Sequence, residues 1–177
     1  MFYIMEQKIS EAYVHVKVPE EIKRGCMNSE FQFLDHKEIS VELDLEYGAE
    51  FPDLIMAEQY VPLISDKMRE RFDYWGIDNL FYKRINLKIP ELEIEEIYWL
   101  ALPPRIDCLD PEEAFDQEFQ VCVKIAIIGN RVGNYDIFKL QGGNDEIILT
   151  QRLKELLETE IHSQKLKGIV IKDLETD

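Results

Sequence analysis

The chain has 177 residues, of which 36 are acidic and 20 are basic, giving a formal net charge of −16 at pH 7. Its content of 46% hydrophobic and 11% aromatic residues is enough to form a core, which excludes a disordered chain. Because binding to DNA, RNA or an anionic membrane requires Lys and Arg, the excess of acid argues against all three partners.

The start of the chain and its cysteines predict a cytoplasmic protein. The apolar run at residues 1–5 ends at Glu6, so it is too short for a signal peptide or a membrane span. Cys26, Cys108 and Cys122 are odd in number and widely spaced, which argues against a disulfide framework and a structural zinc site. We expect buried free thiols.

The first part of the chain predicts strands. Residues 38–47 alternate strictly between apolar and polar or acidic side chains, which is typical of a strand with one buried face. Residues 13–18 and 31–34 have the pattern of shorter strands, and residues 25–29 predict a turn between them because they begin with a glycine.

A strand–helix–strand pattern then occurs twice. Each copy begins at an aspartate, Asp53 or Asp136, and has a hydroxyl residue, Ser65 or Thr150, where a helix begins. A side-chain oxygen at that position can accept a hydrogen bond from a free amide of the first turn, so we expect two helix N-caps. The helices are predicted to end near Trp75 and Ile161, and the strands after them to span 80–89 and 168–174. The pattern suggests an internal duplication.

Two apolar stretches lie between the copies. Residues 94–102 are apolar enough for a central strand, and residues 119–128 are almost continuously apolar. Both stretches predict strands buried on both faces. Pro103 ends the first stretch, residues 107–117 form an acidic connector, and residues 129–134 predict a turn.

These elements predict an α+β fold. We expect a strand-dominated, mostly antiparallel core with two flanking helices. Residues 1–177 form a single domain in this interpretation, or two packed lobes at 1–90 and 91–177.

The chain lacks the motifs of common enzymes. It has no Gly-x-Ser-x-Gly elbow and no phosphate-binding loop. Pro52-Asp53 could begin a nuclease motif, but no later lysine has Asp or Glu two residues before it. None of His15, His36 and His162 has a second histidine four residues later to share a metal. We predict no enzyme, no cofactor and no metal site.

The negative charge is concentrated between Pro90 and Phe119, where ten acidic residues and one basic residue give a net charge of −9. The spacing lacks the glycine and the alternating ligands of a calcium loop. A solvated loop that keeps the protein soluble is one interpretation, and a docking surface for a basic protein is the functional one. The candidate partner-binding residues are Glu95, Glu96, Asp107, Asp110, Glu112, Glu113, Phe115 and Asp116.

Three groups of short motifs resemble those of a known family. They are Phe51-Pro52-Asp53 with Pro62-Leu63-Ile64-Ser65; Tyr98-Trp99-Leu100 with Arg105-Ile106-Asp107-Cys108-Leu109-Asp110; and Asp136-Ile137-Phe138-Lys139-Leu140 with Ile147-Ile148-Leu149-Thr150-Gln151-Arg152-Leu153-Lys154 and Leu166-Lys167-Gly168-Ile169. Together they resemble the immunity-protein family formerly catalogued as domain of unknown function 1629, the eleventh immunity class of bacterial polymorphic-toxin systems, over about residues 51–171. Lys139 stands where that pattern has Arg.

The resemblance implies a small intracellular protein, encoded beside a bacterial toxin, that binds and neutralises the toxin without catalysis. The expected partner is a cognate toxin with a basic surface. The alternative is a regulatory module that mimics nucleic acid, in which strand-face acids imitate phosphates: Glu38, Glu42, Asp44 and Glu46.

Overall fold

Two five-stranded sheets form the framework of the described part of the chain, which comprises residues 1–28, 38–43, 48–58, 60–116, 118 and 121–174 of the computed structural model. The strands are β1 (Phe2–Gln7), β2 (Ile39–Glu42), β3 (Leu54–Ala57), β4 (Val61–Ser65), β5 (Phe81–Ile89), β6 (Ile94–Leu102), β7 (Arg105–Ile106), β8 (Ile137–Leu140), β9 (Ile147–Thr150) and β10 (Ile169–Asp173). The helices are α1 (Glu20–Asn28), α2 (Asp66–Tyr74) and α3 (Gln151–His162), with short 3-10 turns η1 (Pro90–Leu92) and η2 (Gly129–Arg131). Among these described strands only β2–β5 and β7–β8 pair in parallel, so the predicted α+β fold is confirmed.

The pattern predicted to occur twice builds both sheets. The β3–β4 hairpin leads directly into α2 and then β5, and the β8–β9 hairpin leads into α3 and then β10. The strand orders are β2-β5-β6-β4-β3 and β10-β1-β9-β8-β7. In each sheet one strand, β6 or β1, therefore lies between the hairpin and the strand that follows the helix. β6 follows β5 along the chain, whereas β1 comes from the other end of the chain.

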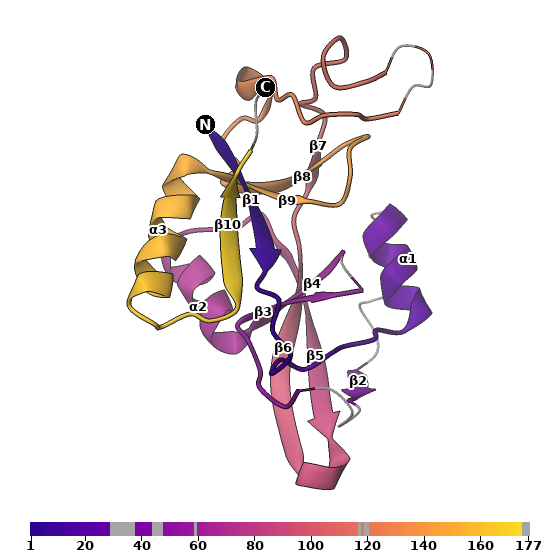
Figure 1. Cartoon of the computed structure of the whole chain (residues 1–177), viewed down its shortest axis with the longest axis vertical. Helices are drawn as coiled ribbons and strands as arrows, with labels where there is room; N and C mark the ends of the chain where they lie inside the picture. The colour runs from indigo at the N-terminus through magenta and orange to yellow at the C-terminus, as the bar shows by residue number, and fades with distance from the viewer. Residues whose placement is uncertain (29–37, 44–47, 59, 117, 119–120, 175–177) are drawn as a thin grey trace.

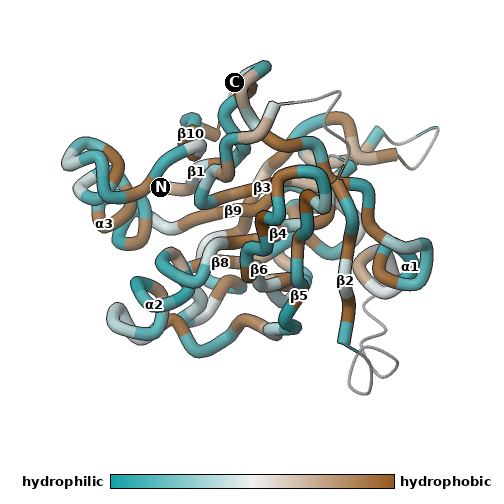
Figure 2. Tube along the Cα trace, turned by 90° about the horizontal axis from the view of Figure 1, so that it is seen from below, coloured by the Kyte–Doolittle hydropathy of each residue, from teal (hydrophilic) through white to brown (hydrophobic). Residues whose placement is uncertain are grey.

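The two units pack against each other through a shared apolar core. Side chains of α2 and α3, including Phe72 and Leu157, form one cluster with the inner faces of both sheets. In the sheet that contains β2 to β6, α1 and residues 14–18 cover the outer face. In the sheet that contains β1 and β7 to β10, the described residues of 108–132 cover the outer face. As a result, α2 and α3 lie on one side of the molecule and α1 on the opposite side (Figures 1 and 2).

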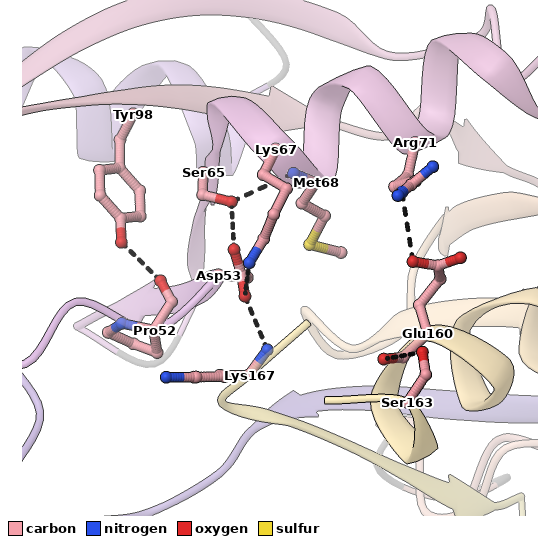
Figure 3. A network of polar contacts seen from close by, with 10 residues as sticks. All are labelled: Pro52, Asp53, Ser65, Lys67, Met68, Arg71, Tyr98, Glu160, Ser163 and Lys167. Carbon is pink, nitrogen blue, oxygen red and sulfur yellow. Dashed lines mark hydrogen bonds and ion pairs between the residues drawn. The ribbon is translucent and has the colours of Figure 1, made fainter. Parts of the chain in front are cut away.

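Asp53 joins the two units at the start of β3 (Figure 3). It is 6% exposed, and its carboxylate accepts hydrogen bonds from the Ser65 hydroxyl and the Lys167 backbone amide, each at 2.6 Å. The Lys67 ammonium lies 3.4 Å from the same carboxylate. The Ser65 hydroxyl accepts in turn from the Met68 amide at 3.1 Å, which caps α2 as predicted. Because hydrogen bonds to a charged acceptor are stronger than neutral ones, Asp53 ties the end of the second helical unit to the first.

Asp136 holds the corresponding position before β8. Its carboxylate accepts from the Thr150 hydroxyl at 2.5 Å and is ion-paired with Arg152. The Arg152 guanidinium also donates to the Trp75 carbonyl at 2.7 Å, at the end of α2 in the other unit. Thr150 stands at the predicted N-cap position of α3, but its hydroxyl makes no cap hydrogen bond, so the capping interaction is confirmed only for Ser65. The two aspartates therefore link the units in both directions.

The turn predicted over residues 25–29 is wrong where the structure describes it, because residues 25–28 belong to α1. Ile22 and Cys26 stand one helical turn apart and both are buried, so the helix buries an apolar stripe. A buried face of this kind outweighs the helix-breaking tendency of one glycine.

The strand predicted over residues 13–18 is also not formed. Val14, Val16 and Val18 are buried, so the predicted alternation is present. Among the described residues, however, the segment forms a β-bridge only between Tyr13 and Glu50. β2 keeps the predicted alternation of the 38–47 segment over its described part. Residues 31–34 and 44–47 lie outside the described residues.

Along the chain, the change from the first sheet to the second occurs close to Pro103, between β6 and β7. β5 and β6 pair along their whole length, so a boundary at residue 90 falls inside one hairpin. β1, although it opens the chain, belongs to the second sheet.

The Asp53 link predicts a specific loss of stability. Replacing Asp53 with Ala removes a buried charged acceptor and leaves a partly buried hydroxyl and a partly buried amide without their partner, so we expect the free energy of unfolding to fall by about 2–4 kcal/mol. Asp136→Ala removes the more exposed counterpart and is expected to cost about 1 kcal/mol. Urea unfolding measures both, with Glu70→Ala on the exposed face of α2 as a control expected within about 0.5 kcal/mol. Equal stability of Asp53→Ala and the control would contradict the assignment.

Candidate functional site

The structure separates the eight predicted partner-binding residues into two groups. Glu95 and Glu96 are exposed on β6 beside the β5–β6 turn, and Glu95 is paired with Lys88 at 3.6 Å. The other six lie on residues 107–116. Figure 1 places the β5–β6 turn at one end of the long axis and residues 107–116 at the other. The eight residues therefore do not form one surface.

Within 107–116, the acids have different roles. The Asp110 carboxylate accepts from the backbone amides of Glu112 and Glu113, at 2.9 and 3.3 Å, and the Asp116 carboxylate accepts from the Glu118 amide at 2.9 Å. These two aspartates stabilise turns, which is a common role of that side chain. The acids that face solvent are Asp107, Glu112 and Glu113.

The buried strand predicted over 119–128 is wrong for the described residues 121–128. These residues return beside 109–116 through isolated bridges, Leu109–Ile127 and Phe115–Cys122. Val121 and Val123 are 53% and 62% exposed. A continuous apolar run predicts a core strand, but the run alone does not determine whether its side chains are buried in the fold.

The 107–128 segment therefore presents acids and exposed valines together. Its described residues, 107–116, 118 and 121–128, project from the end of the second sheet (Figure 1). Cys108, Leu109 and Ala114 pack on that sheet, with Phe115 half-buried beside them. Interfaces combine apolar contact with a polar rim, so this segment has the composition of a protein-binding surface.

A cleft of about 1120 Å³ lies between the two sheets. No local sequence pattern predicts it, because the residues that line it come from four separated parts of the chain. These are residues 4–15, Gly48, the region of Met56 and Tyr60, and residues 145–147 at the β8–β9 turn. The acidic residues on its walls are Glu6, Glu11, Asp145 and Glu146.

A buried basic cluster lies next to this cleft. Lys139 is 3% exposed, and its ammonium donates to the Tyr60 carbonyl at 3.1 Å and to the Asp145 carboxylate at 3.4 Å. Arg105 is ion-paired with the same carboxylate. Burial lowers the pKa of Lys139, an effect that Asp145 opposes. Because its ammonium is already bound to a carbonyl and a carboxylate, we assign Lys139 a structural role between β8 and the β3–β4 turn.

Within the described ranges no three His, Cys, Asp or Glu side chains are grouped so that they could hold a metal ion. None of the described helices has the length and apolar character needed to cross a membrane. Cys26 and Cys108 are buried free thiols as predicted, and Cys122 is half-buried.

The alternative function, nucleic-acid mimicry, depends on the four acidic residues predicted on the strand at 38–47. Glu38 and Glu42 are exposed there as predicted, while Asp44 and Glu46 lie outside the described residues.

Comparison of the sequence with known protein families and with curated proteins gives no match. The likeness to the immunity family therefore remains a prediction that rests on the short motifs quoted above.

The burial of Cys26 predicts a pH dependence of stability. Burial raises the pKa of this thiol from 9.0 to about 11. Between these values the unfolded chain loses the proton while the folded protein keeps it, so stability falls as pH rises, by at most about 1.4 kcal/mol per pH unit. We expect Cys26→Ala to remove this part of the slope in urea unfolding between pH 9 and 11. Cys122→Ala is the matched control with a smaller effect, and parallel curves for Cys26→Ala and the unchanged protein would refute the prediction.

Proposed function

We propose that the protein is an immunity protein that binds and neutralises a bacterial toxin domain through the 107–128 segment. The motif resemblance over residues 51–171 suggests the class. The observation that carries the choice of surface is the exposure of Val121 and Val123 beside Asp107, Glu112 and Glu113. A solvated loop needs the acids but gains nothing from two exposed valines, whereas a binding surface uses both.

The two kinds of residue support different steps of binding. Exposed carboxylates attract a basic partner over several ångströms and raise the association rate. Burial of the valines on contact then slows dissociation, since removing apolar surface from water is favourable. The toxin's own cleft for an anionic substrate would supply the basic surface, and occlusion of that cleft would neutralise it.

We also propose that the protein acts in the cytoplasm, where it would bind the toxin before the toxin reaches its target. Three free thiols fit a reducing compartment.

The charge contribution is tested by association kinetics with the toxin domain encoded beside the gene. We expect Glu112→Lys combined with Glu113→Lys to slow association about tenfold at low salt and by less at high salt, because exposed charges are screened. Glu70→Lys with Asp78→Lys, two exposed acids at α2 and just after it, is the control with the same change in net charge. Failure of the unchanged protein to bind this toxin, at both low and physiological salt, would defeat the proposal.

The apolar contribution has a separate signature. Val121→Ser combined with Val123→Ser is expected to raise the dissociation rate about tenfold with little change in the association rate. Both side chains are exposed, so the free energy of unfolding should stay within about 0.5 kcal/mol. An unchanged dissociation rate would remove the 121–128 part of the surface from the interface.

A further inference from the structure

The cleft between the sheets carries an unbalanced negative charge. Among the described residues that line it there is no Lys or Arg, while four acids lie on its walls. Glu6 is paired with Lys172 at 2.5 Å, and Asp145 is paired with Arg105 and Lys139. Two of the four acids are thus compensated by the protein itself.

The other two acids, Glu11 and Glu146, are not compensated. Neither forms an ion pair with any residue in the described ranges. The Oε1 of Glu146 accepts from the Asn144 amide at 3.2 Å, but its Oε2 is shielded from solvent and has no hydrogen-bond partner within the described structure. A carboxylate oxygen without a donor is unfavourable. Because Oε2 is shielded, the Glu146 side chain must turn toward the cleft before a donor from a partner can bind it.

Besides the acids, the lining of the cleft combines apolar and aromatic side chains with the polar residues Gln7, Ser10 and His15. β1 contributes Ile4 and Met5, β3 contributes Met56, and Tyr13 and Tyr60 add two rings. Ile9, also part of the lining, is 96% exposed. Lys and Arg side chains combine an apolar stem with a charged end, and tyrosine rings attract cations. The walls therefore match basic side chains better than a metal ion or an anion.

The size of the cleft allows a chain segment as its occupant. Its volume of about 1120 Å³ lies at the upper limit of the range of about 300–1,000 Å³ that is typical of small-ligand sites. It also adjoins the proposed toxin-binding segment. A Cβ built on Gly142, in the β8–β9 turn, would lie 3.5 Å from the Phe115 ring, and burial together with the Glu146 carboxylate raises the pKa of Cys122. The β8–β9 turn is thus shared by the cleft and the 107–128 segment.

We propose that this cleft receives an extended basic segment of the same toxin partner, with Lys or Arg side chains bound to Glu11 and Glu146. The inference rests on the proposed function and extends it, since it adds a second contact region beside the 107–128 segment. The segment of the partner enters along Ile9 and places its cationic ends at the two uncompensated carboxylates.

The test is calorimetry with the toxin domain encoded beside the gene. We expect Glu11→Gln combined with Glu146→Gln to weaken binding about tenfold or more, because both ion-pair acceptors are lost. The control Glu70→Gln with Asp78→Asn removes two charges far from the cleft lining and is expected to change the affinity less than about twofold. A thermal melt of each variant confirms that it is folded.

A second pair of variants tests the entrance without touching the carboxylates. Ile9→Arg places a positive charge at the mouth of the cleft and is expected to weaken binding about tenfold, whereas Ile9→Glu should leave or improve it. Position 9 is almost fully exposed, so neither change should affect folding.

The outcomes separate the two proposals. Weaker binding by the cleft variants but not by the control supports the inference. Binding of the toxin by all variants with equal affinity overturns the cleft as a contact region and leaves the proposed function in place. Absence of binding by the unchanged protein overturns both.

Discussion

The buried carboxylate of Asp53 is the interaction on which the arrangement of the two sheets depends. It binds the cap of α2 on one side and the backbone after α3 on the other, so both helical units are fixed by one charged group. Asp136 and Arg152 repeat this link in the opposite direction, and Arg71 pairs with Glu160 between the two helices at 3.2 Å (Figure 3). The apolar core holds the two units together, but the hydrophobic effect has no preferred direction. The hydrogen bonds of the two aspartates therefore fix the position of one unit relative to the other.

This packing assigns different tasks to the two sides of the molecule. The interface between the two units consists of α2, α3 and the inner faces of the sheets, whose side chains are buried in the shared core. The segments that leave the sheets on other sides are free of that constraint. The acidic 107–128 segment and part of the cleft lining, namely residues 9–15 and the β8–β9 turn, are built from such segments, which is where binding residues are usually found on a rigid scaffold.

The charge of the chain is used locally rather than as one acidic belt. Asp53, Asp136 and Asp145 hold structure together through buried or half-buried ion pairs, and Asp110 and Asp116 shape turns. The acids to which we assign binding include Glu11, Glu112 and Glu146, which form no ion pair within the described residues, and Glu113, which is exposed and pairs with Lys124 of the same segment at 3.4 Å. A carboxylate that is already ion-paired in the interior of the fold adds little binding free energy with a partner, because its charge is already desolvated and neutralised inside the protein.

The sequence by itself determined the strands and helices whose signals are local. The duplicated pattern, the start of α2 at Ser65 and the alternation of β2 follow from neighbouring residues, because periodicity and capping act over a few positions. Sequence could not reveal that β1 completes the second sheet, or that α1 replaces a predicted turn. It also could not show that 121–128 lies on the surface, or that Glu11 and Glu146 line one cleft. These features arise from contacts between residues far apart in the chain, and only the packing of the two units brings those residues together.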